Sequence, residues 1–246
     1  MKTYIWTVPM RLFHWLLAIG FAAAYLLGDF DELHDWHFAF GAFVGSLLFF
    51  RILFGLVGSM YAHFRDFPIG IKNQLLFLKS FSGEKKSFVG HNPAASLVML
   101  AIFFVGVATS ISGFMLYSSE HTTFLKVAIS EHTLEEVHEV LANLFLILVV
   151  FHLIGLVVDT IFHGKAQTIK SMATGYKNLE AEPSTLTSFQ KTFAALWLIV
   201  PFVLFYLAYG LPISEEGEDE KSEYSQDNEQ FEDEESEEHE EHEGRN

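Results

Sequence analysis

The 246-residue chain contains no cysteine. Disulfides, thiolate-bound metals, iron–sulfur clusters and haem attached through a CxxCH motif are therefore excluded. The common enzyme signatures are missing as well, since the sequence has no Gly-rich phosphate loop, no HExxH and no GxSxG. Basic residues are few, with 15 Lys and Arg against 31 Asp and Glu. Any chemistry of this protein must depend on other side chains or on a bound group.

Apolar residues and acidic charge are abundant, but they occupy different parts of the chain. Half of the residues are hydrophobic, and 26 of them are Phe. From Glu215 to the C-terminus there are 17 acidic residues against Lys221 and Arg245, so the rest of the chain is close to neutral. A segment with such low hydrophobicity and like charge cannot bury enough surface to offset the entropy of ordering. We therefore expect an apolar body and a disordered acidic tail over 214–246.

The apolar body consists of five long hydrophobic runs. A membrane-spanning helix needs about 20 apolar residues. The runs cover Met10–Leu27, Phe38–Gly58, Pro93–Tyr117, Glu136–Phe162 and Phe189–Gly210. Asn92 is suited to cap the third helix, with Pro93 in its first turn, and Pro201 is tolerable as a kink in the fifth. The sequence therefore predicts an all-α integral membrane protein.

The loops between these runs differ in basic residues, which determine orientation. The N-terminus and the loops after the second and fourth runs hold eleven Lys and Arg, whereas the opposite side holds three. The N-terminus is thus expected in the cytoplasm and the acidic tail outside. Within one basic loop, "PIGIKNQLLFLKSF" is typical of a short amphipathic helix on the membrane surface.

An alternative interpretation of the first run is a signal peptide. It has a basic start, an apolar centre and a candidate cleavage site at Ala22–Ala24. Arg11 and His14 within the apolar part argue against cleavage, and we expect the segment to be retained.

Four histidines lie in or at the ends of the apolar runs: His14, His37, His138 and His152. An ionisable side chain inside a bilayer is costly and indicates function. His138 and His152 are separated by fourteen residues, which places them ~40° apart on one helix face and ~21 Å apart along its axis. By depth, His14 matches His152 near the cytoplasmic side, and His37 matches His138 near the outer side.

Two depth-matched imidazole pairs are what two bis-histidine haems require. Without cysteine, the cofactor would be haem b, held without covalent bonds. Arg51, at the depth of the cytoplasmic pair, is a candidate partner of a haem propionate, although snorkelling to the interface would also explain it. Small residues on the helices would leave room for a macrocycle or simply allow close helix packing; they are Gly41, Gly45, Gly106, Gly113 and Gly155.

Other histidine chemistry remains open. Zinc needs three or four ligands around one point, which two separated pairs do not supply. The outer histidines are expected to face solvent: His34, His121, His132, His239 and His242. On the cytoplasmic side, His91 and His163 are within possible reach of propionates, but loop histidines such as these and His63 usually face water. A histidine-lined transporter is a further alternative, against which the absence of internal repeats argues.

Several segments resemble the bacterial cytochrome b561 family, which includes the b-type subunits of nickel–iron hydrogenases and thiosulfate reductases. They are "WTVPMRLFHWLLAIG", "FRILFGLVGSMYAHF", "GHNPAASLVML" and "HEVLANLFLILVVFHLIG", within about residues 4–177. The resemblance implies two haems b in a four-helix core, with electrons carried between membrane quinone and a partner protein. It assigns His14 with His152 to the cytoplasmic haem and His37 with His138 to the outer haem.

The expected organisation is a di-haem domain over 1–180, an additional transmembrane helix over 181–213 and the tail over 214–246. The expected function is electron transfer, with no nucleic-acid partner. The tail favours a basic periplasmic c-type cytochrome as partner, unless it is only a solubilising extension. A hydrogenase or another dehydrogenase or reductase complex is the alternative partner.

Overall fold

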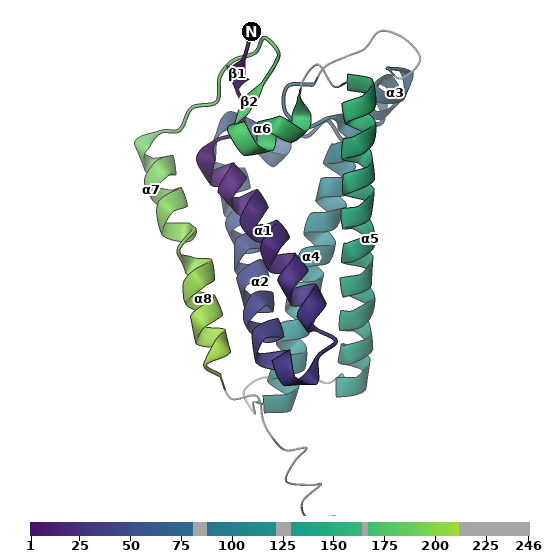
Figure 1. The fold of residues 1–246 in the computed structure, drawn as a ribbon, viewed down its shortest axis with the longest axis vertical. Helices are drawn as coiled ribbons and strands as arrows, with labels where there is room; N and C mark the ends of the chain where they lie inside the picture. Colours follow the sequence, from purple (N-terminus) through teal and green to yellow (C-terminus); the bar gives the residue numbers. More distant parts are fainter. Residues whose placement is uncertain (81–87, 122–128, 164–166, 212–246) are drawn as a thin grey trace, which may run out of the picture. The chain divides into compact units, whose positions relative to one another are not determined.

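The computed structural model describes residues 1–80, 88–121, 129–163 and 167–211. The long helices are α1 (Val8–Leu27), α2 (His34–Val57), α4 (Pro93–His121), α5 (Glu131–His163), α7 (Ser188–Trp197) and α8 (Val200–Tyr209). Shorter helices are η1 (Asp31–Leu33), η2 (Met60–Ala62), η3 (Phe64–Asp66), α3 (Ile71–Lys79) and α6 (Thr168–Thr174). A two-stranded sheet pairs β1 (Thr3–Tyr4) with β2 (Tyr176–Lys177) (Figure 1).

The predicted all-α membrane bundle is confirmed. Five segments of the described chain are long and apolar enough to cross a membrane: Val8–Leu27, Asp31–Val57, Pro93–Ser119, Glu131–Phe162 and Ser188–Tyr209. They agree with the five predicted runs to within a few residues at most ends. All of the helices described here belong to one compact unit, Met1–Leu211, while the predicted disorder of the tail concerns residues outside the described ones.

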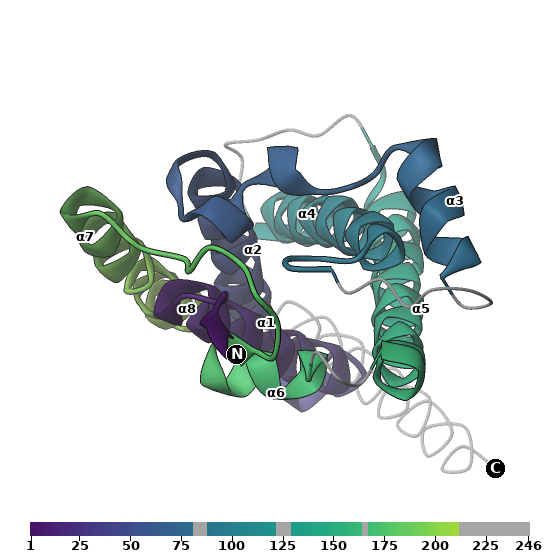
Figure 2. The same cartoon turned by 90° about the horizontal axis from the view of Figure 1, so that it is seen from above.

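Helix α2 is the centre of the bundle. It packs against α1, α4 and α8, and α4 in turn packs against α5. Seen along the helices, α7 and α8 lie on the side of α2 away from α5 (Figure 2). The buried cluster beneath these contacts includes Phe13, Phe43, Leu47, Phe50 and Phe54. Because lipid tails are as apolar as these side chains, close packing rather than removal from water favours such contacts in a bilayer.

Helices α1 and α5 meet mainly through side chains. The rings of Phe21 and Phe145 have centroids 4.2 Å apart, and the hydroxyl of Tyr25 donates to Asn143 Oδ1 at 2.8 Å. Both contacts lie between the two levels at which the candidate histidines occur. Helices α1 and α5 are therefore joined at mid-depth, between the two levels of histidines.

The fifth span consists of two helices rather than one. Helix α7 ends at Trp197 and α8 begins at Val200, immediately before Pro201. Proline has no N–H to donate, and its ring clashes with the carbonyl four residues earlier, here that of Trp197. The predicted kink at Pro201 is therefore an interruption of the helix. Aromatic rings attach α8 to α2, with Phe43 and Phe202 at 5.2 Å between centroids.

Two local predictions are confirmed at the end of the bundle that carries the N-terminus. Asn92 caps α4, since its Oδ1 accepts a hydrogen bond from the Ala95 N–H at 2.7 Å. The amphipathic segment forms α3, on which Ile71 and Leu78 are exposed. Its position on a membrane surface stays a prediction.

The sheet was not predicted, because each strand has only two residues. Thr3 pairs with Lys177 and Tyr4 with Tyr176, and the indole N–H of Trp6 donates to Ser171 Oγ at 3.1 Å. Gly175 makes the close approach possible. Its φ of +90° suits glycine, and a Cβ there would lie 2.5 Å from the Tyr4 ring. These contacts fix the start of α1 against the segment that follows α5.

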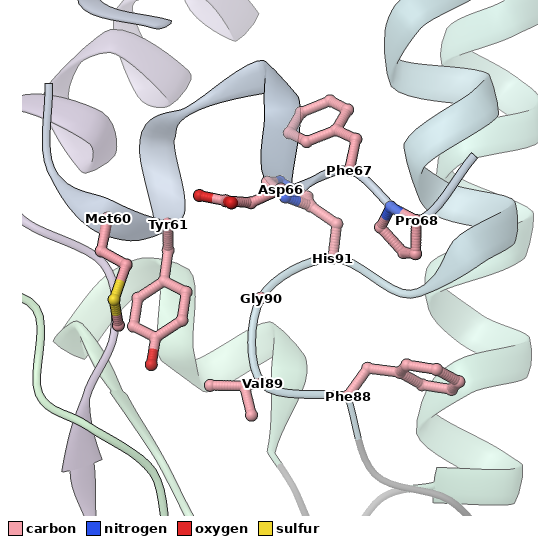
Figure 3. A pocket seen from close by; sticks show the side chains of 9 residues that line it. All are labelled: Met60, Tyr61, Asp66, Phe67, Pro68, Phe88, Val89, Gly90 and His91. Atoms are coloured by element: carbon pink, nitrogen blue, oxygen red, sulfur yellow. The ribbon is translucent and has the colours of Figure 1, made fainter. Parts of the chain in front are cut away.

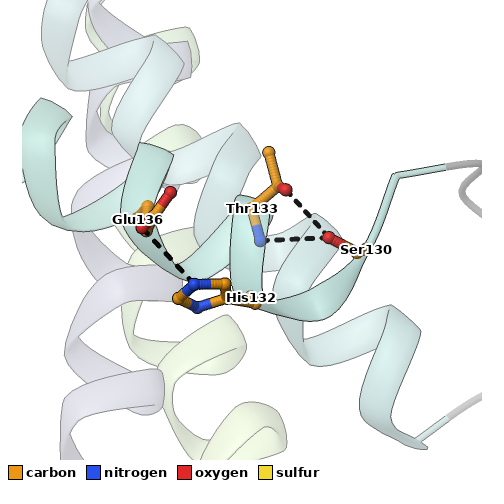
Figure 4. A network of polar contacts seen from close by, with 4 residues as sticks. All are labelled: Ser130, His132, Thr133 and Glu136. Carbon is orange, nitrogen blue, oxygen red and sulfur yellow. Dashed lines mark hydrogen bonds and ion pairs between the residues drawn. The ribbon is translucent and has the colours of Figure 1, made fainter.

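The N-terminal end of α5 is capped by Ser130, and the residues around the cap are exposed (Figure 4). The Thr133 N–H donates to Ser130 Oγ at 3.3 Å, and His132 Nε2 lies 3.4 Å from a carboxylate oxygen of Glu136. His132 and His34 are exposed, as predicted. The predictions for His121, His239 and His242 concern side chains outside the described part of the chain.

Candidate functional site

The four intramembrane histidines form two facing pairs. His14 of α1 and His152 of α5 have ring centroids 6.5 Å apart, and we call them the inner pair, at the end with the N-terminus. His37 of α2 and His138 of α5 are 6.0 Å apart and form the outer pair, at the other end. Two imidazoles on opposite sides of one metal ion have ring centres about 6 Å apart, since each metal–nitrogen bond is about 2 Å. Both spacings therefore suit a metal between the rings.

Hydrogen bonding determines the tautomer of His37. Its Nδ1 lies 2.8 Å from the carbonyl oxygen of Ala24. A carbonyl can only accept, so Nδ1 carries the proton and donates. The lone pair of Nε2 is then free to bind a metal, and such a bond from the second ring nitrogen is usual for metal-binding histidines.

The same argument applies to His138. Ser112 Oγ donates to the Thr109 carbonyl at 2.9 Å, which uses its single proton. His138 Nδ1 lies 3.0 Å from Ser112 Oγ and 3.1 Å from the Thr109 carbonyl, so both must accept from it. The Nε2 atom of His138 is left free. Gly113 makes room for the ring, because a Cβ there would lie 2.8 Å from His138 Cε1.

The hydrogen bonding at the inner pair differs from that at the outer pair, because several buried nitrogens near it have no partner among the described residues. Among the described residues, His14 Nδ1, Arg11 Nε and both Nη atoms of Arg51 are buried without a hydrogen-bond partner. Arg51 is only 2% exposed, and its guanidinium stacks over Phe64 at 4.4 Å. Buried donors are nearly always satisfied in proteins. A bound anionic group is the simplest acceptor for the guanidinium nitrogens, which a haem propionate would supply.

His91 also belongs to this end of the site, although a loop histidine was expected to face water. Its ring lies against Trp6 and Phe67, with centroids 4.8 and 4.7 Å away. Burial, together with the nearby charges of Arg51 and Lys177, lowers the pKa of His91 to about 3. The imidazole is therefore neutral at physiological pH, and a ring nitrogen is able to accept a hydrogen bond without adding charge to the site.

Two buried charged residues beside the inner pair were not predicted from the sequence, Lys177 and Asp159. Lys177 is 3% exposed and donates to the Gly90 carbonyl at 2.7 Å. Burial lowers its pKa to about 8, against the opposing effect of Asp159. Asp159, 8% exposed, accepts from Asn92 Nδ2 at 3.2 Å and from the Thr168 hydroxyl at 2.8 Å. The available signal was the position of Asp159 in an apolar run, seven residues and about two turns after His152.

The glycines of the helices fall into two groups. A Cβ at Gly45 would lie 3.2 Å from Ser110, and one at Gly106 would lie 3.0 Å from Leu48, so both permit close helix packing. A Cβ at Gly41 or Gly155 would meet nothing within 4 Å. Gly41 follows His37 by one turn and Gly155 follows His152 by three residues. Open space thus adjoins one histidine of each pair, as a macrocycle requires.

A pocket of about 370 Å³ opens beside His91 (Figure 3). Apolar side chains make up most of its lining, and Tyr61, Asp66 and His91 add polar groups; the remaining residues are Met60, Phe67, Pro68, Phe88, Val89 and Gly90. The Tyr61 hydroxyl donates to the Glu182 carbonyl at 2.8 Å. The pocket suits a small ring with polar substituents, and its position next to His91 brings it close to the inner pair.

Helices of membrane length, opposed intramembrane imidazoles and the absence of cysteine are the features of a membrane cytochrome b. The chain belongs to the prokaryotic cytochrome b561 family, whose profile matches residues 5–175. It is accordingly a multi-pass membrane cytochrome with haem of the b type. The match ends before α7 and α8.

Several relatives are cytochrome subunits. The chain is 25% identical over 149 residues to the probable Ni/Fe-hydrogenase 1 B-type cytochrome subunit of Escherichia coli (strain K12), covering 49% of this chain and 62% of that protein. It is 27% identical over 142 residues to the probable Ni/Fe-hydrogenase B-type cytochrome subunit of Bradyrhizobium diazoefficiens, covering 47% of this chain and 58% of that protein. The match thus spans about 60% of these relatives. No solved structure matches the chain.

Proposed function

We propose that this chain binds two haems b, each between one histidine pair, and carries electrons across the membrane between quinone and a redox partner at the outer face. The observation that carries this proposal is the two facing histidine pairs, each with one member on α5, whose ring centroids are 6.5 and 6.0 Å apart. Haem b supplies one-electron chemistry at its iron. The protein holds the two groups at different depths, so an electron can pass from one side of the membrane to the other.

The side chains have separate roles in this proposal. The four histidines would supply the ligands of the two irons. At the outer pair Nε2 would be the ligand atom, because Nδ1 of His37 and Nδ1 of His138 donate to the carbonyls of Ala24 and Thr109. Arg51, and with it Arg11, would donate to propionates at the inner haem. Both Nη atoms of Arg51 and Nε of Arg11 have no acceptor within the described residues and are available for this role. Gly41 and Gly155 leave the space that the macrocycles would fill. Lys177 and Asp159 hold the loops over the inner end through their hydrogen bonds.

The pocket beside His91 is the place we propose for the quinone ring. Phe67 and Val89 offer apolar contact, while neutral His91 and the Asp66 carboxylate are able to accept hydrogen bonds from the hydroxyl groups of a quinol. The exposed apolar side chains of α3 follow the pocket in sequence and would lie in the adjoining lipid. Quinone would thus enter from the membrane and react next to the inner haem.

The haem content of the purified holoprotein tests the proposal. We expect two haems b per chain, because each histidine pair supplies both axial ligands of one iron. A pyridine-haemochrome assay, calibrated against protein concentration by amino-acid analysis, measures the ratio. A ratio near one would mean that one histidine pair does not bind haem. A colourless preparation that contains zinc would contradict the proposed electron transfer and favour a metal-handling function.

The orientation that we propose places the N-terminus in the cytoplasm and the acidic tail in the periplasm of a bacterial inner membrane. It is supported by the eleven basic residues on one side against three on the other. A reporter enzyme that is active only outside the cytoplasm, fused after Gly210, should be active, whereas activity of the same reporter after Ser80 would invert the assignment.

The outer partner that we propose is a basic c-type cytochrome, attracted by the 17 acidic residues after Ser214. Truncation after Pro212 should leave both haem spectra unchanged, because all proposed ligands precede it. It should slow electron transfer to a basic cytochrome c several-fold at low salt and much less at high salt, since exposed charges are screened over ~8 Å at physiological ionic strength.

Stopped-flow rates of the full-length and truncated proteins across a salt series measure this effect. A variant with the acidic residues of the tail replaced by Gln and Asn keeps its length and serves as a control for size. Equal low-salt rates in all three proteins would leave the tail as a solvated extension.

A hydrogenase is the second candidate partner. Relatives that match the chain are named as Ni/Fe-hydrogenase B-type cytochrome subunits. In that case the partner would contact the outer end of the bundle and donate electrons inward. Copurification of a hydrogenase with the membrane-extracted protein would favour this partner over the cytochrome.

A further inference from the structure

The two histidine pairs are held by different means. At the outer pair, Nδ1 of His37 donates to the Ala24 carbonyl and Nδ1 of His138 to the Thr109 carbonyl and Ser112 Oγ. Both rings are therefore tied to the backbone of a neighbouring helix. At the inner pair, His14 Nδ1 is buried and has no such partner among the described residues.

The angle between the two imidazole planes also differs between the outer and the inner pair. The outer rings are perpendicular, at 90° to one another, whereas the inner rings are inclined at 54°. Ala24 and Thr109 lie on different helices, α1 and α4, and their carbonyls determine the plane of each outer ring separately. Gly113 closes the space behind His138, since its Cα side approaches Cε1 so closely that a Cβ would not fit.

We propose that Ser112, together with the Thr109 carbonyl, is a positioning device that keeps the axial imidazole of His138 perpendicular to that of His37 in the haem-bound protein. This inference rests on the proposed di-haem function. Ser112 acts through His138 and does not touch the metal. Its proton is held by the Thr109 carbonyl, so toward His138 it is only an acceptor, which keeps the proton of the imidazole on Nδ1 and Nε2 directed to iron.

The relative orientation of axial imidazoles has a direct spectroscopic consequence. The filled π orbital of each imidazole is perpendicular to the ring, and it raises the energy of the iron d-orbital with which it overlaps. Parallel rings raise the same one of the two iron d-orbitals of π symmetry, so the two orbitals differ in energy. Perpendicular rings raise one orbital each, so the two orbitals stay nearly equal in energy. Low-spin ferric haem with perpendicular imidazoles therefore gives a strongly anisotropic EPR signal with a large maximum g value, and the axial ligands are a principal means by which a protein tunes its haem.

EPR of the fully oxidised holoprotein tests the proposal. We expect two low-spin ferric signals, of which the more anisotropic belongs to the outer haem and disappears in His37→Ala. Ser112→Ala should move the maximum g value of that signal downward or broaden it, with the inner signal unchanged. Ser112→Thr retains a hydroxyl and should restore the wild-type position.

Ser110→Ala is the matched control, because the Ser110 hydroxyl donates to the Gly106 carbonyl of its own helix at 3.0 Å. It should change neither signal. An outer signal that is unaltered in Ser112→Ala, or loss of the less anisotropic signal in His37→Ala, would overturn the inference while leaving two haems in place. Absence of low-spin ferric haem from the wild-type protein would instead reject the proposed function itself.

Discussion

A His152→Ala variant is expected to contain one haem per chain, the outer one, where the wild-type protein contains two. Alanine has no lone pair for iron, and His14 alone would leave the inner haem with a single axial ligand. The outer pair should be unaffected, because His37 and His138 keep their own hydrogen bonds to Ala24 and Thr109. The pyridine-haemochrome ratio should fall to about half that of the wild type.

The converse variant, His138→Ala, should lose the outer haem and keep the inner one. Low-temperature absorption spectra separate the two components, so each variant identifies the one it lacks. His132→Ala is the matched control on the same helix, since His132 is exposed and lies beside Glu136. It should retain both haems. Two intact spectral components in either ligand variant would show that the proposed pairing is incorrect.

The Gly113→Ala variant is expected to lose most of the outer haem through a single added methyl group. That methyl would lie 2.8 Å from His138 Cε1, closer than carbon atoms approach without a shift. The ring cannot move away freely, because its Nδ1 is bound to Thr109 and Ser112. Overpacking of this kind costs about 1–3 kcal/mol, and relief of the clash would turn Nε2 away from iron.

Gly106→Ala separates this effect from general disturbance of the same helix. Its methyl group would lie 3.0 Å from Leu48 and 3.1 Å from Phe145, which are apolar packing contacts without a histidine. Both variants should lower the thermal unfolding temperature of the membrane-extracted protein, but only Gly113→Ala should lower the content of outer haem. Equal haem loss in both would mean that His138 is not held in place by Gly113.

The sequence alone predicted the membrane-spanning helices and which histidines would face one another. A membrane-spanning helix requires a run of about 20 apolar residues. Such a run is contiguous in the sequence, so all five segments were predicted. The pairing followed from the fourteen-residue spacing of His138 and His152, because helical periodicity and an alternating membrane topology assign depth and face together. The ring distances of 6.5 and 6.0 Å agree with that pairing, while iron binding by the four residues remains our proposal.

The tertiary structure decided what depends on contacts between distant segments. Sequence position did not indicate that the Nδ1 atoms of His37 and His138 are directed to carbonyls on other helices. It also did not indicate that two buried nitrogens of Arg51 have no acceptor in the part of the chain that the structure describes. His91 was expected in water but is packed between Trp6 and Phe67, because β1 and β2 draw the N-terminus over the inner end. Such contacts join residues far apart in the chain, and no local pattern of polarity encodes which partners will meet.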